Sequence, residues 1–348
     1  MKLFLFPVIY KVRSFGDETV ESYLRLLNNP AVIRFREMEM KLKERRKLFF
    51  FFNVRWMERK LSVRSLYWIL GAHAFVRAMF KRNPPFVQIP ACMTTKNSVR
   101  TVRETRRQGY LKPIPEYFPE RLAEPKWMSR CRIEGLDRVL QARQDSRPVV
   151  LAFFHSRAYR MSRFWLRAAG VSVANLIAGK AAARPKLDRL GDGFSPFPEI
   201  PTAFYLDQLR QACKFLAARN SLLVALDTPA GQQLNVPICD GWTFQMSTGA
   251  IRLAVLYQAE LIPCVIIDEG RWRFQIKLGR PVPAEYLAVE ADWIHAGKHL
   301  LKEMLPHFRD HPDQLTEQLA WHFQPSRCVT PLECLPDESL HADQFVAR

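Results

Sequence analysis

The sequence predicts an α/β fold in which a central mixed sheet is flanked by helices on both faces. Three segments, at 148–154, 221–227 and 261–268, are continuously apolar, which is typical of strands covered on both faces. Helical patterns lie between these segments, as expected for a helix-flanked sheet. The first third of the chain differs in charge: residues 1–110 hold 23 Lys and Arg against 8 Asp and Glu, so +15 of the net charge of +18 lies there.

The individual elements of the α/β part follow from local patterns. In 271–279, large apolar and polar residues alternate, which indicates a half-exposed strand near an edge of the sheet. Ser247 or Thr248 is expected to cap the following helix. An apolar stripe predicts another helix before Asn220, and its members are Leu206, Leu209, Cys213 and Leu216. The predicted strands are 148–154, 171–177, 221–227, 261–268 and 271–279, and the closing helices are 287–308 and 312–322.

The basic N-terminal third is predicted to be mostly helical and to associate with a membrane. In 41–56, a cationic cluster adjoins four consecutive Phe residues and Trp56. Such blocks suit a lipid interface, whereas nucleic-acid binders interleave aromatic and basic residues. Burial of the Phe run in a core is the alternative. Residues 61–80 are the best spanning candidate, but Arg64, His73 and Arg77 interrupt them, so we expect an amphipathic helix and a peripheral or monotopic protein.

Two predicted strands end in a side chain capable of acid–base chemistry. His155 follows the first apolar run, and Asp227 ends the run at 221–227. Because ligands gather at the carboxyl ends of strands in α/β sheets, these residues have the types needed for general-base catalysis on a hydroxyl. A strand-end histidine is more often structural, and a strand-end aspartate often belongs to a turn. Both interpretations remain open at this point.

From about residue 120 to 325, the chain resembles the lysophospholipid acyltransferase superfamily, and specifically its bacterial lipid A biosynthesis branch of late, or secondary, acyltransferases. The family pattern begins with a strand-end histidine in HX4(D/E) and continues with an acidic turn, a VPFFG-like element, a Thr-Gly helix start and an HPEQ…W element. The corresponding segments are His155–Arg160 (HSRAYR), Ala225–Gly231 (ALDTPAG), Val236–Gly241 (VPICDG), Thr248-Gly249-Ala250 followed by Leu253-Ala254 and Leu261-Ile262-Pro263, and His311–Gln314 (HPDQ) with a displaced Trp321.

The resemblance implies a glycerolipid acyltransferase-like fold and transfer of a fatty acyl chain from acyl-carrier protein or acyl-CoA to a hydroxyl of a glycolipid or lipid-linked saccharide. It implies His155 as the general base and a location at the cytoplasmic face of the bacterial inner membrane, in lipopolysaccharide or capsule biosynthesis. An anionic membrane, a phosphorylated acceptor and an acidic carrier protein would all be attracted by the basic N-terminal third. The family commonly begins with a membrane-spanning helix, and residues 61–80 are the nearest equivalent. The expected organisation is 1–110 (basic, membrane-associating), 111–330 (acyltransferase-like) and 331–348 (tail).

Arg160 stands where the family has its acidic residue, and a cation cannot accept a hydrogen bond from the imidazole or stabilise imidazolium. Three explanations compete. Asp227 can orient His155 and leave Arg160 to bind a phosphate or carboxylate of the substrate. His155 can act unassisted and slowly, since triad enzymes lose about 10⁴ in rate without the orienting acid. Alternatively, the protein is an inactive relative that binds or presents lipid. The first explanation is favoured.

The remaining site predictions concern substrate contacts and absent cofactors. His295/His299 and His307/His311 have metal-like i, i+4 spacing, but neither pair has an acidic or cysteine partner in a recognised signature, so no metal is expected. No Gly-rich nucleotide motif occurs, so no cofactor is expected beyond the acyl donor. A basic nucleic-acid-binding protein remains a further alternative, although no nucleic-acid partner is expected. Substrate contacts are predicted for Arg157, Arg160, Lys180, Arg252, Thr248 and Gly249, with a solvated surface position as the alternative for Arg157, Lys180 and Arg252.

Overall fold

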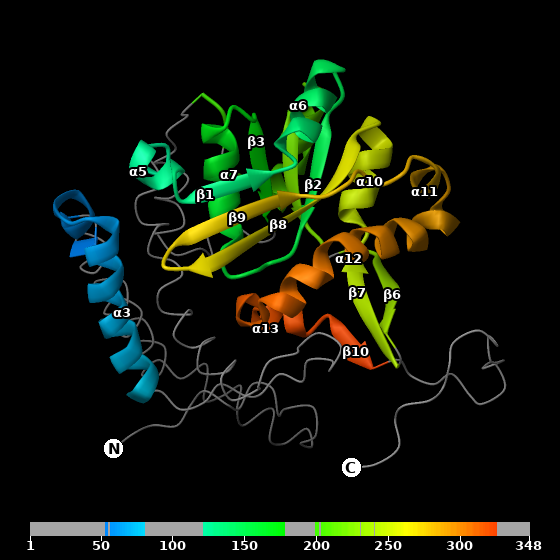
Figure 1. The fold of residues 1–348 in the computed structure, drawn as a ribbon. Coiled ribbons are helices and arrows are strands. Elements are labelled where there is room, and N and C mark those ends of the chain that lie inside the picture. Colours follow the sequence, from blue (N-terminus) through cyan, green and yellow to red (C-terminus); the bar gives the residue numbers. More distant parts are fainter. Residues whose placement is uncertain are drawn as a thin grey trace, which may run out of the picture.

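The structure is a computed structural model, and its main sheet is mixed. It describes residues 53–54, 56–80, 121–177, 199–201, 203–229, 231–239 and 241–325. Within these ranges, seven strands form one sheet in the order β1-β9-β8-β2-β5-β3-β4 (Figure 1). The strands from β8 to β4 are parallel, β9 runs antiparallel to β8, and β1 runs parallel to β9. The strands are β1 (Cys131–Glu134), β2 (Val149–Phe153), β3 (Val173–Ile177), β4 (Ala203–Tyr205), β5 (Ser221–Ala225), β8 (Glu260–Gly270) and β9 (Arg273–Leu278).

Helices cover both faces of this sheet, as the sequence predicts. One apolar core unites inward-facing residues of β2 and β5 with α6 (Leu136–Gln144) and α7 (Tyr159–Ala168). The other core unites the opposite faces of the same strands with α9 (Leu209–Ala217), α10 (Gly249–Tyr257) and α12 (Trp293–Asp310). All five residues of β2 and all five of β5 are buried, because strands in this position have no solvent-facing side. The expected α/β class is therefore confirmed.

The sequence patterns locate the central strands well but miss the peripheral ones. All five predicted strands are present, and β9 lies next to the edge strand β1. The strands β1 and β4 of the main sheet and the whole second sheet were not predicted. The second sheet has the order β10-β7-β6 and consists of β6 (Gln233–Cys239), β7 (Trp242–Ser247) and β10 (Phe323–Pro325). Its strands contain many polar residues, and β1, β4 and β10 are only three or four residues long, so none has a strong apolar pattern.

Several predicted helices are shorter than expected. The segment 287–308 is divided into α11 (Glu285–Ala288), a 3₁₀ turn (Glu290–Asp292) and α12, and the segment 312–322 contains a 3₁₀ turn (Pro312–Gln314) and α13 (Glu317–Ala320). The stripe before Asn220 is only partly right. A 3₁₀ turn (Leu206–Gln208) precedes α9, Leu206 and Leu209 are exposed, and Ala212 and Leu216 face the core. The side-chain amide of Asn220 does donate to the carbonyls that end α9.

The described part of the N-terminal region packs against the α/β core. The helix α3 (Val63–Phe80) places Val63, Leu66, Tyr67, Leu70 and Ala74 in the same core as α6 and α7. Tyr67 meets the ring of Trp272 edge-on, with ring centroids 5.2 Å apart. None of the helices in the described ranges has both the length and the apolar character needed to cross a bilayer. The Phe run at 49–52, most of the N-terminal third, the predicted boundaries at 110 and 330, and the tail lie outside the described residues.

A buried carboxylate joins this region to the α/β part. Glu58, which is 1% exposed, lies 2.7 Å from Arg121 Nε and 2.5 Å from Lys126 Nζ, and accepts a hydrogen bond of 3.1 Å from the indole N–H of Trp127. The α-helix α5 (Pro125–Met128) supplies two of these partners. A buried ion with several charged and polar partners fixes the placement of its own segment relative to the segments that supply the partners. Any displacement would leave the charge unpaired in an apolar surrounding.

We expect Glu58→Gln to lower the free energy of unfolding by about 2–4 kcal/mol, because it leaves two cations without their buried counter-ion. Urea unfolding followed by tryptophan fluorescence measures the change. Glu124→Gln is the matched control: its ion pair with Arg121 is far less buried than Glu58, so it should cost less than about 1 kcal/mol. Equal effects of the two substitutions would contradict the role assigned to Glu58.

Candidate active site

The parallel pairing of β2 and β5 brings the two predicted acid–base residues together. Phe153 and Ala225 are register partners at the ends of these strands, and the ladder continues with Leu226 N–H donating to Phe153 O at 2.9 Å. His155 lies two residues beyond Phe153, and Asp227 lies two residues beyond Ala225. The two residues are therefore side by side at the carboxyl edge of the sheet. Because side chains alternate along strands, both point to the face that α7 covers.

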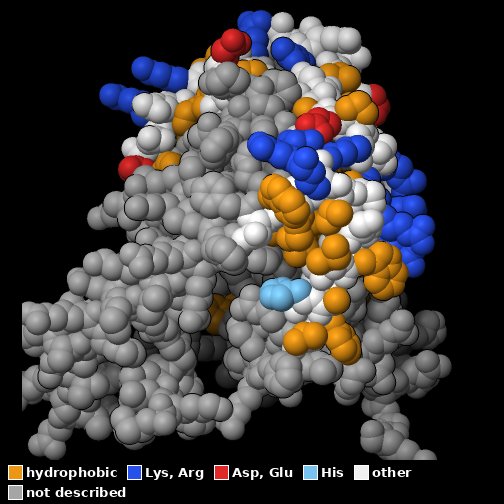
Figure 2. Space-filling view, turned by 90° about the vertical axis from the view of Figure 1, so that its left-hand side faces the viewer, with side chains coloured by type: hydrophobic (Ala, Val, Ile, Leu, Met, Phe, Trp, Pro, Cys, Tyr) orange, Lys and Arg blue, Asp and Glu red, His pale blue; other side chains and the backbone are white. Residues whose placement is uncertain are grey.

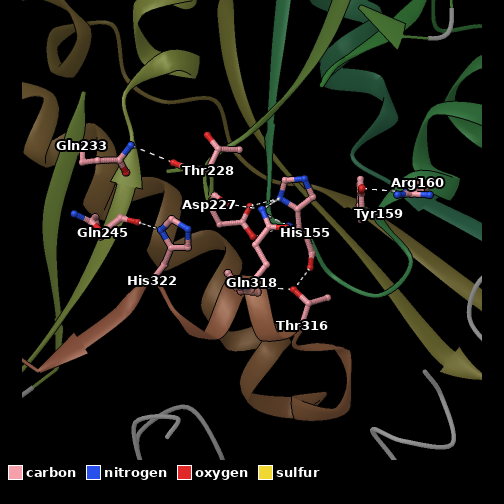
Figure 3. Close-up of polar contacts among 11 residues, drawn as sticks. His155, Tyr159, Arg160, Asp227, Thr228, Gln233, Gln245, Thr316, Gln318 and His322 are labelled. Atoms are coloured by element: carbon pink, nitrogen blue, oxygen red, sulfur yellow. Dashed lines mark hydrogen bonds and ion pairs between the residues drawn. The ribbon is translucent and has the colours of Figure 1, made fainter. Parts of the chain in front are cut away.

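The imidazole of His155 and the carboxylate of Asp227 form a hydrogen-bonded dyad. His155 Nδ1 lies 2.8 Å from Asp227 Oδ1, and the backbone N–H of His155 donates to both carboxylate oxygens at 3.1 and 3.0 Å. The Asp227 side chain is fully buried and that of His155 is 16% exposed. An ionised carboxylate only accepts hydrogen bonds, so Nδ1 carries the proton and Nε2 carries the lone pair. Figure 3 shows Asp227 on one side of the imidazole and Tyr159 on the other.

Arg160 does not occupy the orienting position next to His155. Its Nε donates to the Tyr159 hydroxyl at 3.0 Å, and its guanidinium carbon lies 5.7 Å from the Tyr159 ring centroid. The Tyr159 ring meets the imidazole edge-on at 4.6 Å and stacks on Phe153 at 5.5 Å. In Figure 3, Arg160 lies beyond Tyr159 as seen from His155. The geometry thus corresponds to the explanation in which Asp227 orients the histidine and Arg160 is left for another role.

The arginines near the dyad lie around one helix. Arg157 precedes α7, and Arg160, Arg163 and Arg167 follow at helical spacing, so they share one side of α7. No acidic residue stands in the first turn of α7. Burial, with a smaller contribution from Arg163, lowers the pKa of the Arg167 guanidinium to about 10, so it stays protonated at neutral pH. Arg163 and Arg167 are buried, and Arg167 donates to Ile200 O and Pro201 O, so Arg160, in the first turn, is the helical arginine of this group that stands beside Tyr159.

The other predicted substrate contacts lie in different surroundings. Arg252 contacts Gln232 and lies 3.7 Å from Glu290, in an exposed polar cluster. Thr248 is buried, and its hydroxyl donates to Gln232 O at 3.2 Å, which ties the turn after Asp227 to the start of α10. A side chain at Gly249 would make only ordinary contact, with Ser247 Oγ at 3.5 Å. These positions have structural contacts, while Lys180 lies outside the described residues.

Two residues at the site were not predicted. Thr316 Oγ1 donates to His155 O at 2.6 Å, and Gln318 Nε2 donates to Asp227 O at 2.9 Å and lies 3.2 Å from His155 Nδ1. Both belong to the segment after the HPDQ element, which the sequence pattern treats as one helix. Gln318 lies in α13 and Thr316 just before it, after a 3₁₀ turn that ends at Gln314, so no simple periodicity in the sequence marks these residues.

The described part of the chain contains no group of three or more His, Cys, Asp or Glu side chains that could hold a metal ion. The His295 and His299 side chains make other contacts: the His295 ring lies tilted against Tyr286, with centroids 5.6 Å apart, and His299 Nε2 is 3.1 Å from Arg280 O. Burial is the main cause that lowers the pKa of His307.

Comparison with known proteins yields one structural neighbour of note. No protein-family model and no curated protein matches the chain. The crystal structure of the 1-acyl-sn-glycerophosphate (LPA) acyltransferase PlsC from Thermotoga maritima is similar, with 14% identity and a TM-score of 0.38 over 78% of this chain and 98% of that one. With these values the neighbour does not assign a function to this chain.

Proposed function

We propose that this protein is an acyltransferase that transfers a fatty acyl chain from acyl-carrier protein or acyl-CoA to a hydroxyl of a glycolipid or lipid-linked saccharide. The observation that carries the proposal is the His155–Asp227 dyad at the carboxyl edge of the sheet, with Nδ1 held by a buried carboxylate at 2.8 Å. The ordered segments that resemble lipid A acyltransferases, from HSRAYR to HPDQ, support the choice of acyl transfer over other general-base reactions.

In this mechanism, His155 Nε2 takes the proton of the acceptor hydroxyl while the oxygen attacks the thioester carbonyl carbon. Asp227 remains ionised and stabilises the imidazolium that forms. The tetrahedral intermediate then collapses, the C–S bond breaks, and the leaving thiolate takes the proton back from Nε2. The products are the ester and the free thiol, and His155 returns to its starting state. The contact of Arg160 with Tyr159, and not with the imidazole, supports catalysis over the alternative of an inactive lipid-binding relative.

We expect His155→Ala and Asp227→Asn each to lower kcat for acyl transfer by about 10²–10⁴-fold, because one removes the base and the other its orienting charge. Transfer of radiolabelled acyl chains from acyl-ACP and acyl-CoA to bacterial glycolipid extracts measures this. His295→Ala and Asp207→Asn replace exposed residues away from the dyad and should retain wild-type rates. A background rate shared by wild type and both dyad variants across all donors would disprove catalysis at this site.

Arg160 is proposed to bind an anionic group of the acceptor, such as a phosphate. It stands in the first turn of α7, one residue from Tyr159 and on the same side of the helix as Arg163 and Arg167. A guanidinium binds phosphate with charge-assisted hydrogen bonds. The helix N-terminus adds favourable partial positive charge. The first turn of α7 therefore places a cation near the dyad that would act on the acceptor hydroxyl.

We expect Arg160→Gln to raise KM for a phosphorylated acceptor roughly 10–100-fold with a small effect on kcat, because a charged hydrogen bond contributes about 1.5–3 kcal/mol. Steady-state kinetics with the acceptor before and after phosphatase treatment measures the change. Arg143→Gln, on the exposed side of α6, is the control. A gain of activity in Arg160→Glu would instead identify the arginine as a defect in the motif.

Membrane docking is proposed through the outer side of α3. Trp68 and Phe75 are 63% and 52% exposed, and Ile69 and Val76 are also exposed. Arg59, Lys60 and Arg64 are exposed close to them in the chain. Figure 2 shows apolar side chains next to a group of Lys and Arg on the side of the molecule where α3 lies. Aromatic residues that enter the acyl boundary beside cations that meet phosphates suit an anionic bilayer surface.

We expect the double variant Trp68→Glu/Phe75→Glu to reduce binding to phosphatidylglycerol vesicles by roughly tenfold or more, because it replaces buried apolar area with repelled charge. Co-sedimentation with vesicles measures binding. Leu256→Glu, at an exposed position of α10, is a control of similar chemistry. Unchanged binding of the double variant, or a preference of the wild type for duplex DNA over anionic vesicles, would contradict this docking surface.

A further inference from the structure

Three polar side chains of the C-terminal segment bind the ends of three neighbouring strands. Gln314, Thr316 and Gln318 belong to residues 314–318, here called the strap, which runs from the end of the 3₁₀ turn through Leu315 and Thr316 into α13. Leu315 between them has extended backbone angles, with φ −63° and ψ 134°. Their partners belong to β8, β2 and β5, which are adjacent in this order in the sheet. The strap therefore crosses the carboxyl edge of the sheet where the dyad lies.

Gln314 anchors the strap on β8. It is fully buried, its Oε1 accepts from Asp268 N–H and its Nε2 donates to Asp268 O, each at 3.4 Å. Its own carbonyl accepts from the backbone N–H of Arg157 at 3.0 Å. A buried amide with both ends bonded holds one orientation, since a displaced amide would leave polar atoms unsatisfied.

Thr316 holds the residue that β2 delivers to the site. Its hydroxyl donates to His155 O at 2.6 Å and accepts from Leu319 N–H at 3.2 Å. The same hydroxyl thus fixes the His155 backbone and caps α13 (Figure 3). This contact lies two residues beyond the end of β2, where ladder hydrogen bonds to β5 no longer hold the chain.

Gln318 holds the residue that β5 delivers. Its amide donates to Asp227 O at 2.9 Å, and the same nitrogen lies 3.2 Å from His155 Nδ1. Nδ1–H is directed at the carboxylate at 2.8 Å, and an amide N–H only donates, so the hydrogen bond by which Gln318 holds the site is the one to Asp227 O. The opposite nitrogen, Nε2, has no hydrogen-bond partner among the described residues.

We propose that Thr316 and Gln318 are positioning residues that hold the backbones of His155 and Asp227 in register, so that the carboxylate stays in place to accept the hydrogen bond from Nδ1. The strap acts on the backbone carbonyls of both dyad residues, so it replaces the ladder contacts that are lost beyond the strand ends. Its effect on catalysis rests on the proposed function, whereas its effect on the imidazole does not.

The test combines Thr316→Val with Gln318→Met, which keep side-chain volume while removing the hydrogen bonds. In wild-type protein with ¹⁵N-labelled histidine, the His155 signal, assigned by its loss in His155→Asn, is expected to show one tautomer, protonated at Nδ1. In the double variant, the signal is expected to move toward a mixture of both tautomers. The kcat for acyl transfer is expected to fall about 10–100-fold at unchanged KM, because small displacements of reacting groups cost this much.

Two comparisons separate positioning from general weakening of the structure. Thr316→Ser, made as a single substitution with Gln318 retained, keeps the hydroxyl. This variant should show the single tautomer of the wild type. Gln324→Met makes the same change in β10, where the amide donates to Gln245 at 3.1 Å, and should leave the His155 signal and kcat unchanged. If the double variant does not fold in urea titrations, Gln318→Met alone provides the measurement, since it leaves the cap of α13 intact.

The outcomes distinguish this proposal from the proposed function. A wild-type tautomer and wild-type kcat in a folded Gln318→Met/Thr316→Val protein would overturn the strap's role. Loss of the single tautomer in that variant supports the strap even if the wild type transfers no acyl chain from any donor. In that case, the proposed function fails and the positioning of the imidazole stands.

Discussion

The parallel pairing of β2 with β5 is the constraint on which the candidate site depends. Both strands are buried on both faces, and they pair in register over their full length. The residues that follow the two strands are therefore side by side where the chain leaves the sheet. The fully buried carboxylate of Asp227 can exist there because the N–H groups of one residue, His155, satisfy its oxygens. A carboxylate without those donors would carry a large desolvation cost in this position. The hydrogen bonds from His155 therefore stabilise the buried carboxylate, and the carboxylate in turn orients the imidazole.

The position of Arg160 follows from the same local geometry. The chain turns after His155 and enters α7 at Tyr159, whose ring lies against the imidazole. The next residue on the helix is rotated by about 100°, so Arg160 cannot point where the ring of Tyr159 already stands. The aromatic ring separates the imidazole from the cation, while the acid comes from a neighbouring strand. A basic residue at this position is therefore compatible with a negatively charged partner for His155.

The rest of the chain supports this edge of the sheet from two sides. The segment around Glu58 and α5 fixes α3 against the core that contains α7, and the strap fixes the ends of β8, β2 and β5. Both attachments use polar groups with several partners, and Glu58 and Gln314 among them are fully buried. Such contacts contribute modest net stability but strongly specify one arrangement, because alternatives leave polar atoms unsatisfied. They join regions far apart in sequence around the candidate site.

The sequence by itself determined the five central strands, the helices on both faces, and the delivery of His155 and Asp227 at strand ends, because β2, β5 and β8 have continuous apolar runs of clear length and β9 alternates. It did not determine that β2 and β5 are neighbours, and only this pairing converts two separate residues into a dyad. The short strands, the shortened closing helices and the strap were decided by tertiary contacts, since their residues bind backbone groups distant in sequence. The direction of the Arg160 side chain was also decided by tertiary contacts. The sequence showed only a cation where an acidic residue was expected, and the packing of the Tyr159 ring against the imidazole keeps that cation away from His155.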